Sequence, residues 1–295
     1  MHVILIFIIV QMLHCSFGNI LSRTFNRAIR QTMFEQEIED KNALHKLDNH
    51  IARRLIVMPL TDAFKPHQAD LMHGKVQYGD KCSLPSSLGR LIFEKRYEVP
   101  WIFEVTRVSN TINNLKKREK SVSISIEERE QNNLVNESQS TSKQRLDKAY
   151  ISPLDFRSPE NYIFLPRWLM SDMNLAPNDV VDVSLVRIKL ASLVVFQPLS
   201  LEWDDLIKSG GDPKSLLERE LNKYSSLTSG STIYIEVGGK EYPLRVYATY
   251  AEGGVQVRAV RVQDSDVSTD IDRSVVDSLL QKEREKKQAE DTTDS

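Results

Sequence analysis

Cysteine and histidine are both scarce in this sequence, and their positions exclude several kinds of chemistry. Of the two cysteines, Cys15 lies in a segment that we expect to be removed, which leaves Cys82 alone. A disulfide framework and a cysteine-based zinc cluster are therefore not expected. Histidine-activated nucleophiles and histidine metal ligands are not expected in the later three quarters either, because all six histidines precede residue 74: His2, His14, His45, His50, His67 and His73.

An excess of one charge sign is also missing. The formal net charge is −2, and the basic residues are scattered without an aromatic–basic stripe, so the sequence predicts no nucleic-acid partner. No Asp-Thr-Gly or Asp-Ser-Gly tripeptide supplies the paired carboxylates of an aspartic protease. Asp264, Asp266, Asp270 and Asp272 could ligate a metal in principle, but we expect them to be solvated acids. We therefore predict no cofactor, no metal and no catalysis.

The N-terminus has the features of a targeting segment. The apolar run Val3–Leu13 reaches about 16 Å as a helix, far short of the ~30 Å hydrocarbon core, so no stable membrane span is expected. With small residues before Asn19, it predicts a signal peptide over 1–18. Residues 19–55 start with arginines and no acidic residue before Glu35, which is typical of a transit peptide; an amphipathic leader helix is the alternative.

Together the two segments predict localisation to a plastid of secondary origin, on its periplastid side. The alternative is the cytoplasm or the surface of the endoplasmic reticulum.

Two distant stretches follow the same local plan. Leu84-Pro85 and Leu165-Pro166 each end an apolar strand and place proline where a helix begins, a position that proline favours. An alternating strand follows each short helix, at Trp101–Val105 and Val180–Ile188. We therefore expect two strand–helix–strand halves that close one barrel.

A second, smaller lobe should follow the barrel. Asp212 and Pro213 predict the start of a helix, and Gly238-Gly239 predicts a hairpin turn between two strands. The charged, apolar-poor stretch 113–148 is predicted to be a disordered insertion. We therefore predict a barrel over 56–198, an α/β lobe over 199–272 and a charged tail over 273–295.

The run Tyr162–Met170, with Leu165-Pro166-Arg167-Trp168-Leu169 at its centre, resembles a signature of the ubiquitin fusion degradation protein 1 family. Further elements match that family in the same order over about 57–272. These are Leu84–Leu88, Tyr97–Pro100, Phe196–Pro198, Asp205-Leu206, Pro213-Lys214, Leu216–Glu218 and Leu227-Thr228.

The resemblance implies a mainly β, α+β fold: a double-psi β-barrel followed by a small α/β lobe. It also implies a non-catalytic adaptor that binds ubiquitin or a ubiquitin-like modifier. Such an adaptor pairs with the nuclear-protein-localisation cofactor and presents substrates to the valosin-containing AAA ATPase, for degradation or, here, organelle import. Residues 273–295 contain none of the Phe-Gly pairs through which the family contacts the ATPase. The alternative function is a scaffold subunit of a protein-import complex that does not bind ubiquitin.

Four residues are the candidate binding residues. Trp203 lies among acidic neighbours, which favours either a surface contact or packing within the lobe. Phe196, Gln197 and Pro198 lie where the two lobes are expected to join, and a rigid linker is the alternative there. Trp168 is expected to belong to the core.

Overall fold

The computed structural model describes residues 28–43, 51–61, 77–108 and 146–293. The predicted signal peptide, much of the transit-like segment and almost all of the predicted insertion lie outside these residues. The chain divides into two compact units, Met1–Asn49 and His50–Ser295. Within the first unit, residues 28–43 form a helix. None of the described helices is both long enough and apolar enough to cross a bilayer.

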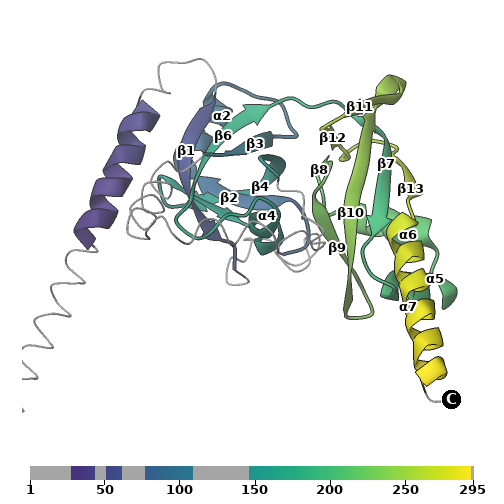
Figure 1. Ribbon diagram of the computed structural model, residues 1–295. Coiled ribbons are helices and arrows are strands. Elements are labelled where there is room, and N and C mark those ends of the chain that lie inside the picture. Colours follow the sequence, from purple (N-terminus) through teal and green to yellow (C-terminus); the bar gives the residue numbers. More distant parts are fainter. Residues whose placement is uncertain (1–27, 44–50, 62–76, 109–145, 294–295) are drawn as a thin grey trace, which may run out of the picture. The chain divides into compact units, whose positions relative to one another are not determined.

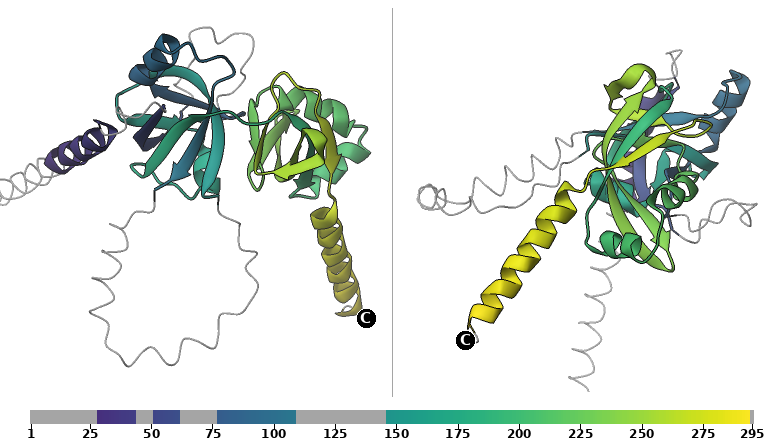
Figure 2. Two further views of the ribbon diagram at one scale, coloured as in Figure 1. Left: turned by 90° about the horizontal axis from the view of Figure 1, so that it is seen from above. Right: turned by 90° about the vertical axis from the view of Figure 1, so that its right-hand side faces the viewer.

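The first part of the second unit is a closed six-stranded barrel, visible in Figures 1 and 2. The strand order around it is β1-β5-β2-β4-β3-β6. The pairs β1/β5 and β2/β4 are parallel, and the other neighbours are antiparallel. The strands are β1 (Ala52–Pro59), β2 (Lys81–Pro85), β3 (Ile102–Arg107), β4 (Lys148–Ser158), β5 (Tyr162–Leu165) and β6 (Val180–Val186).

The barrel consists of two equivalent halves. The strands β1, β2 and β3 of the first half correspond to β4, β5 and β6 of the second. Corresponding strands have corresponding neighbours in the barrel, and each pair of neighbours has the same parallel or antiparallel direction in both halves. Leu84 and Leu165 are fully buried in the same core, and the residues before them, Ser83 and Phe164, pair directly. The prediction that two strand–helix–strand units close one barrel is therefore confirmed.

Each half also caps the helix of the other half. In α2 (Ser86–Glu94), Ser87 donates from its backbone N and from Oγ (2.7 Å) to Glu160, in the turn before β5. In α4 (Arg167–Asp172), the backbone N of Arg167 donates to Oε1 of Gln77, before β2, at 3.0 Å. Pro85 and Pro166 are the N-cap residues of these helices, so each stands one position earlier than predicted.

The second part is a smaller α/β lobe, as predicted. Its main sheet has the order β11-β10-β7-β13, and β9 pairs with β10 on the side opposite β7 (Figure 1). Asp212 caps α6 as predicted, and Gly238 and Gly239 both have positive φ in the hairpin turn. The elements are β7 (Ala191–Pro198), α5 (Glu202–Lys208), α6 (Pro213–Leu221), β8 (Ser226–Thr228), β9 (Thr232–Val237), β10 (Lys240–Ala251), β11 (Val255–Val257), β12 (Ala259–Arg261) and β13 (Ser268–Ile271).

The boundaries of both parts differ from the predicted ones. The strand β7 (Ala191–Pro198) belongs to the sheet of the lobe, where it pairs with β10 and β13, so the lobe already includes residue 191 and does not begin at 199. The barrel begins at Ala52, inside the segment predicted as a leader. The predicted tail forms α7 (Ser274–Thr293), whose Val276 is buried.

Candidate functional site

The four candidate binding residues all lie in the interior of the lobe. Trp203 is 2% exposed, and its ring meets that of Tyr242 edge-on at 6.3 Å between centroids. Phe196 and Pro198 are buried. Gln197 is buried too, and its Nε2 donates to Asp272 Oδ2 (2.8 Å) and Ser274 Oγ (3.0 Å), which ties β7 to the start of α7. Their observed role is packing, and a role in binding stays a prediction.

A buried carboxylate makes several of the contacts that join the barrel and the lobe. Asp80, just before β2, is 1% exposed. Its two oxygens accept hydrogen bonds from the backbone N of Ser225 and of Ser226, both at 2.9 Å, and from Ser226 Oγ at 2.9 Å. Lys81 Nζ lies 3.8 Å from the same carboxylate and also donates to Ser225 Oγ (2.6 Å). A buried charge with this many donors is well satisfied, and it fixes the start of β8 on the barrel.

Two more contacts strengthen this junction. The backbone N of Thr232, at the start of β9, donates to Asp172 Oδ2 at 2.6 Å. Trp168 packs against the cores of both parts, with its ring centroid 6.4 Å from that of Tyr224, and its Nε1 donates to Gly79 O at 3.1 Å. Trp168 is thus partly buried and packs against both cores, which confirms in part the expectation that it belongs to the core. No single-residue signal in the sequence indicated Asp80, because its partners lie more than a hundred positions away.

An apolar surface lies on the barrel at the end of α2, and we call it the α2 patch: Phe93, Val99, Trp101 and Phe156. Phe93 is 64% exposed and Val99 is 72% exposed. The Trp101 ring lies edge-on to Phe93 at 5.2 Å and to Phe156 at 6.0 Å, which holds the aromatic rings in fixed positions. The ring contacts join Phe93 to the partly buried Trp101 and Phe156, and Val99 stands two residues before Trp101 in the chain. Exposed apolar side chains near such a cluster are typical of protein-contact surfaces.

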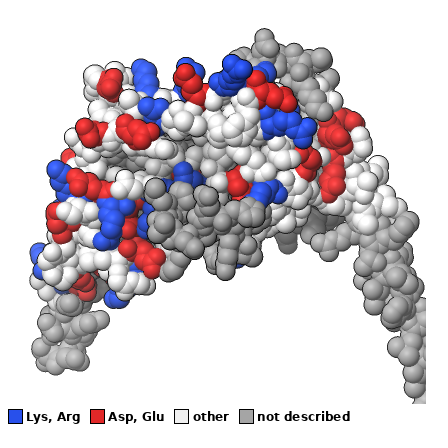
Figure 3. Space-filling model, turned by 180° about the vertical axis from the view of Figure 1, so that it is seen from behind, with Lys and Arg blue, Asp and Glu red and all other residues white. Residues whose placement is uncertain are grey.

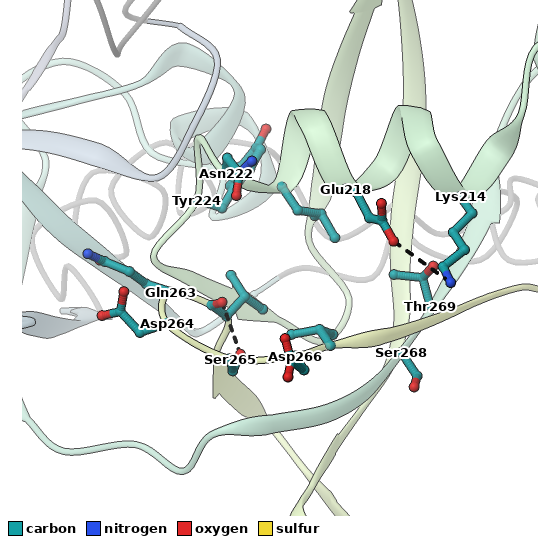
Figure 4. A pocket seen from close by; sticks show the side chains of 13 residues that line it. Lys214, Glu218, Asn222, Tyr224, Gln263, Asp264, Ser265, Asp266, Ser268 and Thr269 are labelled. Carbon is teal, nitrogen blue, oxygen red and sulfur yellow. Dashed lines mark hydrogen bonds and ion pairs between the residues drawn. The ribbon is translucent and has the colours of Figure 1, made fainter.

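A polar groove of about 950 Å³ lies on the lobe between α6 and the segment 262–269 (Figure 4). On the face shown in Figure 3, Lys and Arg side chains lie interspersed with Asp and Glu. Within the described ranges, no three His, Cys, Asp or Glu side chains gather where they could hold a metal ion.

Asp204, next to Trp203, makes contacts in the lobe that we expect to be sensitive to acid. Its buried carboxylate lies 2.7 Å from Lys208 Nζ and 2.6 Å from Arg273 NH2, so it joins α5 to the residue that precedes α7. The close contact with the Lys208 ammonium and then the hydrogen bond from Arg273 lower the pKa of Asp204, against the opposing effect of burial.

Because this pKa is depressed in the folded state, the stabilisation is present above the unfolded value of about 3.9 and is lost as the pH falls through the folded value. We expect Asp204→Asn to lower stability at pH 7 and to reduce the loss of stability between pH 5 and pH 2. Urea titrations across this range would measure it. An unchanged pH profile in the variant would contradict this account of Asp204.

Comparisons with known proteins agree with the resemblance seen in the sequence. Residues 60–189 match the family model described as "Ubiquitin fusion degradation protein UFD1, N-terminal subdomain 1". The chain is 32% identical over 119 residues to Ubiquitin recognition factor in ER-associated degradation protein 1 of Homo sapiens, covering 40% of this chain and 36% of that protein. It is 27% identical over 117 residues to Ubiquitin fusion degradation protein 1 of Saccharomyces cerevisiae, covering 40% and 31%.

A Caenorhabditis elegans protein, Ubiquitin fusion degradation protein 1 homolog, is 24% identical over 177 residues, covering 60% of this chain and 40% of that protein. The matched parts thus span well under half the length of these relatives. The matched range 60–189 takes in β2 to β6 of the barrel. The resemblance to the ubiquitin fusion degradation protein 1 family is therefore confirmed over residues 60–189, which match the model of that family's first N-terminal subdomain.

Proposed function

We propose that this chain is a non-catalytic adaptor that binds ubiquitin, or a ubiquitin-like modifier, on substrate proteins and presents them to an AAA ATPase. Extraction for degradation and translocation into an organelle are both compatible with this role. The family match over the barrel is the observation that supports it most strongly. The names of the relatives, one of them a ubiquitin recognition factor, support the same pathway.

The two halves of the barrel are equivalent, and each half caps the helix of the other. Both features support a barrel of the double-psi type. Such a barrel fills its own interior with side chains, so its function depends on the outer surface. We propose that the α2 patch is the part of that surface that contacts the modifier, because Phe93 and Val99 are the most exposed large apolar side chains of the described barrel.

This proposal predicts that the α2 patch controls ubiquitin binding. Phe93→Ser and Val99→Ser together should lower the affinity for ubiquitin chains at least about tenfold, the effect of losing one or two interface anchors. A pull-down with ubiquitin chains at low salt, followed by titration, measures this. Tyr247→Ser is the matched control, since Tyr247 is 55% exposed but lies on β10 of the lobe.

Both changes remove exposed side chains, so the fold should be retained and circular dichroism should be unchanged. A wild-type chain with no affinity for ubiquitin would favour the second candidate, a scaffold subunit of an import complex. Equal loss of binding in the Tyr247→Ser control would exclude the α2 patch as the contact.

We further propose the valosin-containing AAA ATPase and the nuclear-protein-localisation cofactor as partners, and a plastid of secondary origin as the location. Purification of the tagged chain from its own cells would test the partners, and recovery of a lone monomer would count against them. A fluorescent fusion to residues 1–55 would test the location, and uniform cytosolic fluorescence would reject it.

A further inference from the structure

The edge of the lobe's sheet at β13 is open within the part of the chain that the structure describes. Among the described strands, β13 pairs with β7 alone and ends the strand order. The backbone N of Asp272 donates to Phe196 O at 2.8 Å. Because successive amides of a strand point to opposite sides, the N–H groups of Thr269 and Ile271 point away from β7. An unpaired strand edge of this kind can pair with an extended segment of another chain.

The groove lies beside this edge and supplies contacts for side chains. Leu221 and Val262 form an apolar floor together with Tyr224, and all three are buried. Ser268 and Thr269 of β13 line one wall, and Lys214 and Glu218 of α6 lie across from them (Figure 4). A strand laid along β13 would direct alternate side chains toward the floor and toward the rim.

The charges of the rim are strongly unequal. Of the described residues that line the groove, Lys214 alone is a cation, and its Nζ already lies 3.9 Å from Glu218 Oε1. Asp264 and Asp266 are exposed on the opposite wall and make no hydrogen bond or ion pair within the described residues. Two uncompensated carboxylates beside an open strand edge favour a ligand that carries lysine or arginine.

From this geometry we infer that the groove binds an extended, basic segment of a partner protein, which adds a strand to β13 and places alternate apolar side chains on the Leu221–Val262 floor. This inference does not depend on the ubiquitin role of the barrel. One obstacle is built into the edge, because the N–H of Ile271 donates to Asp270 Oδ1 at 2.8 Å. The incoming strand must displace that carboxylate, so Thr269 supplies the first available donor.

The test is fluorescence anisotropy with the full chain and a labelled peptide of alternating lysine and valine. The matched peptide carries glutamate in place of each lysine. We expect the lysine peptide alone to bind, and its affinity to fall as salt is raised. Asp264→Asn with Asp266→Asn should weaken binding about tenfold, as expected for losing two exposed charge contacts. Asparagine also tolerates the positive φ of Asp264.

A second variant tests the strand pairing itself. Thr269→Pro removes an outward N–H and leaves the pairing with β7 in place, since proline is accepted at strand edges. This variant should also bind the lysine peptide more weakly. Equal binding of both peptides, or unchanged affinity in the Asp264→Asn/Asp266→Asn variant, would overturn the inference. So would dimerisation of the full chain that Thr269→Pro abolishes, because the edge would then pair with a second copy. Ubiquitin pull-down by these variants should be unchanged, which separates this site from the α2 patch.

Discussion

Replacing Asp80 by alanine is expected to lower the free energy of unfolding by about 3 kcal/mol. The carboxylate accepts from two backbone amides and one hydroxyl of the lobe, all at 2.9 Å, in a site closed to water. A hydrogen bond to a charged group contributes about 1.5–3 kcal/mol, and donors that share one carboxylate do not contribute additively. We therefore expect a loss at the upper end of the range for one such bond. Urea denaturation followed by tryptophan fluorescence measures the loss.

Asp80→Asn gives a graded comparison. The amide oxygen of asparagine can still accept a hydrogen bond from one backbone N–H of the lobe. Its NH2 group then faces the other backbone N–H, so we expect an intermediate loss of stability. Glu94→Ala is the matched control, because Glu94 is exposed at the end of α2 and should change stability by less than about 0.5 kcal/mol. If Asp80→Ala costs no more than this control, Asp80 does not hold the lobe on the barrel.

Asp80→Ala should also uncouple the unfolding of the lobe from that of the barrel. With the Asp80 contact present, we expect the barrel and the lobe to unfold together. In Asp80→Ala, hydrogen exchange at the amides of Ser225 and Ser226 should become faster than at β3, because these amides lose their acceptor while the barrel core is untouched. Equal protection from hydrogen exchange at these amides and at β3 in the variant would contradict this expectation. The Thr232–Asp172 hydrogen bond and the packing of Trp168 would then be sufficient to hold the lobe on the barrel.

The repeated halves could be predicted from the sequence because their signals are local. A leucine, a proline and a short helix lie within a few residues of each other at both Leu84 and Leu165. The strand partners and the caps could not be predicted, since they depend on contacts between distant residues. Glu160 caps a helix that begins at Ser86, and Gln77 caps one that begins at Arg167.

The boundary between barrel and lobe was misplaced for the same reason. The predicted barrel ran to residue 198, but its last strand ends at Val186 and the next strand, from Ala191, joins the sheet of the lobe. Which sheet a strand joins is decided by its neighbours and not by its own pattern. The exposure of Phe93 and Val99 is likewise decided by packing, so the α2 patch has no signature in the sequence.

Trp203 had a usable signal that its acidic neighbours obscured. Trp203, Leu206 and Ile207 stand at helical spacing, which puts them on one face of α5, and that face packs against the lobe core. We therefore expect Trp203→Ala to lower the free energy of unfolding by about 3–5 kcal/mol, the usual cost of truncating a buried tryptophan. Trp203→Phe, which keeps an aromatic ring near Tyr242, should cost less.

This substitution also separates packing from recognition. Trp101→Ala is the matched comparison, because Trp101 is only partly buried and belongs to the α2 patch. At a temperature where both variants are folded, Trp203→Ala should bind ubiquitin chains as the wild type does, whereas Trp101→Ala should bind them more weakly. Denaturation curves and pull-downs on the same samples give both quantities. Loss of ubiquitin binding in Trp203→Ala with little loss of stability would reverse the assignment, because a side chain that only fills the core cannot change affinity while the core remains intact.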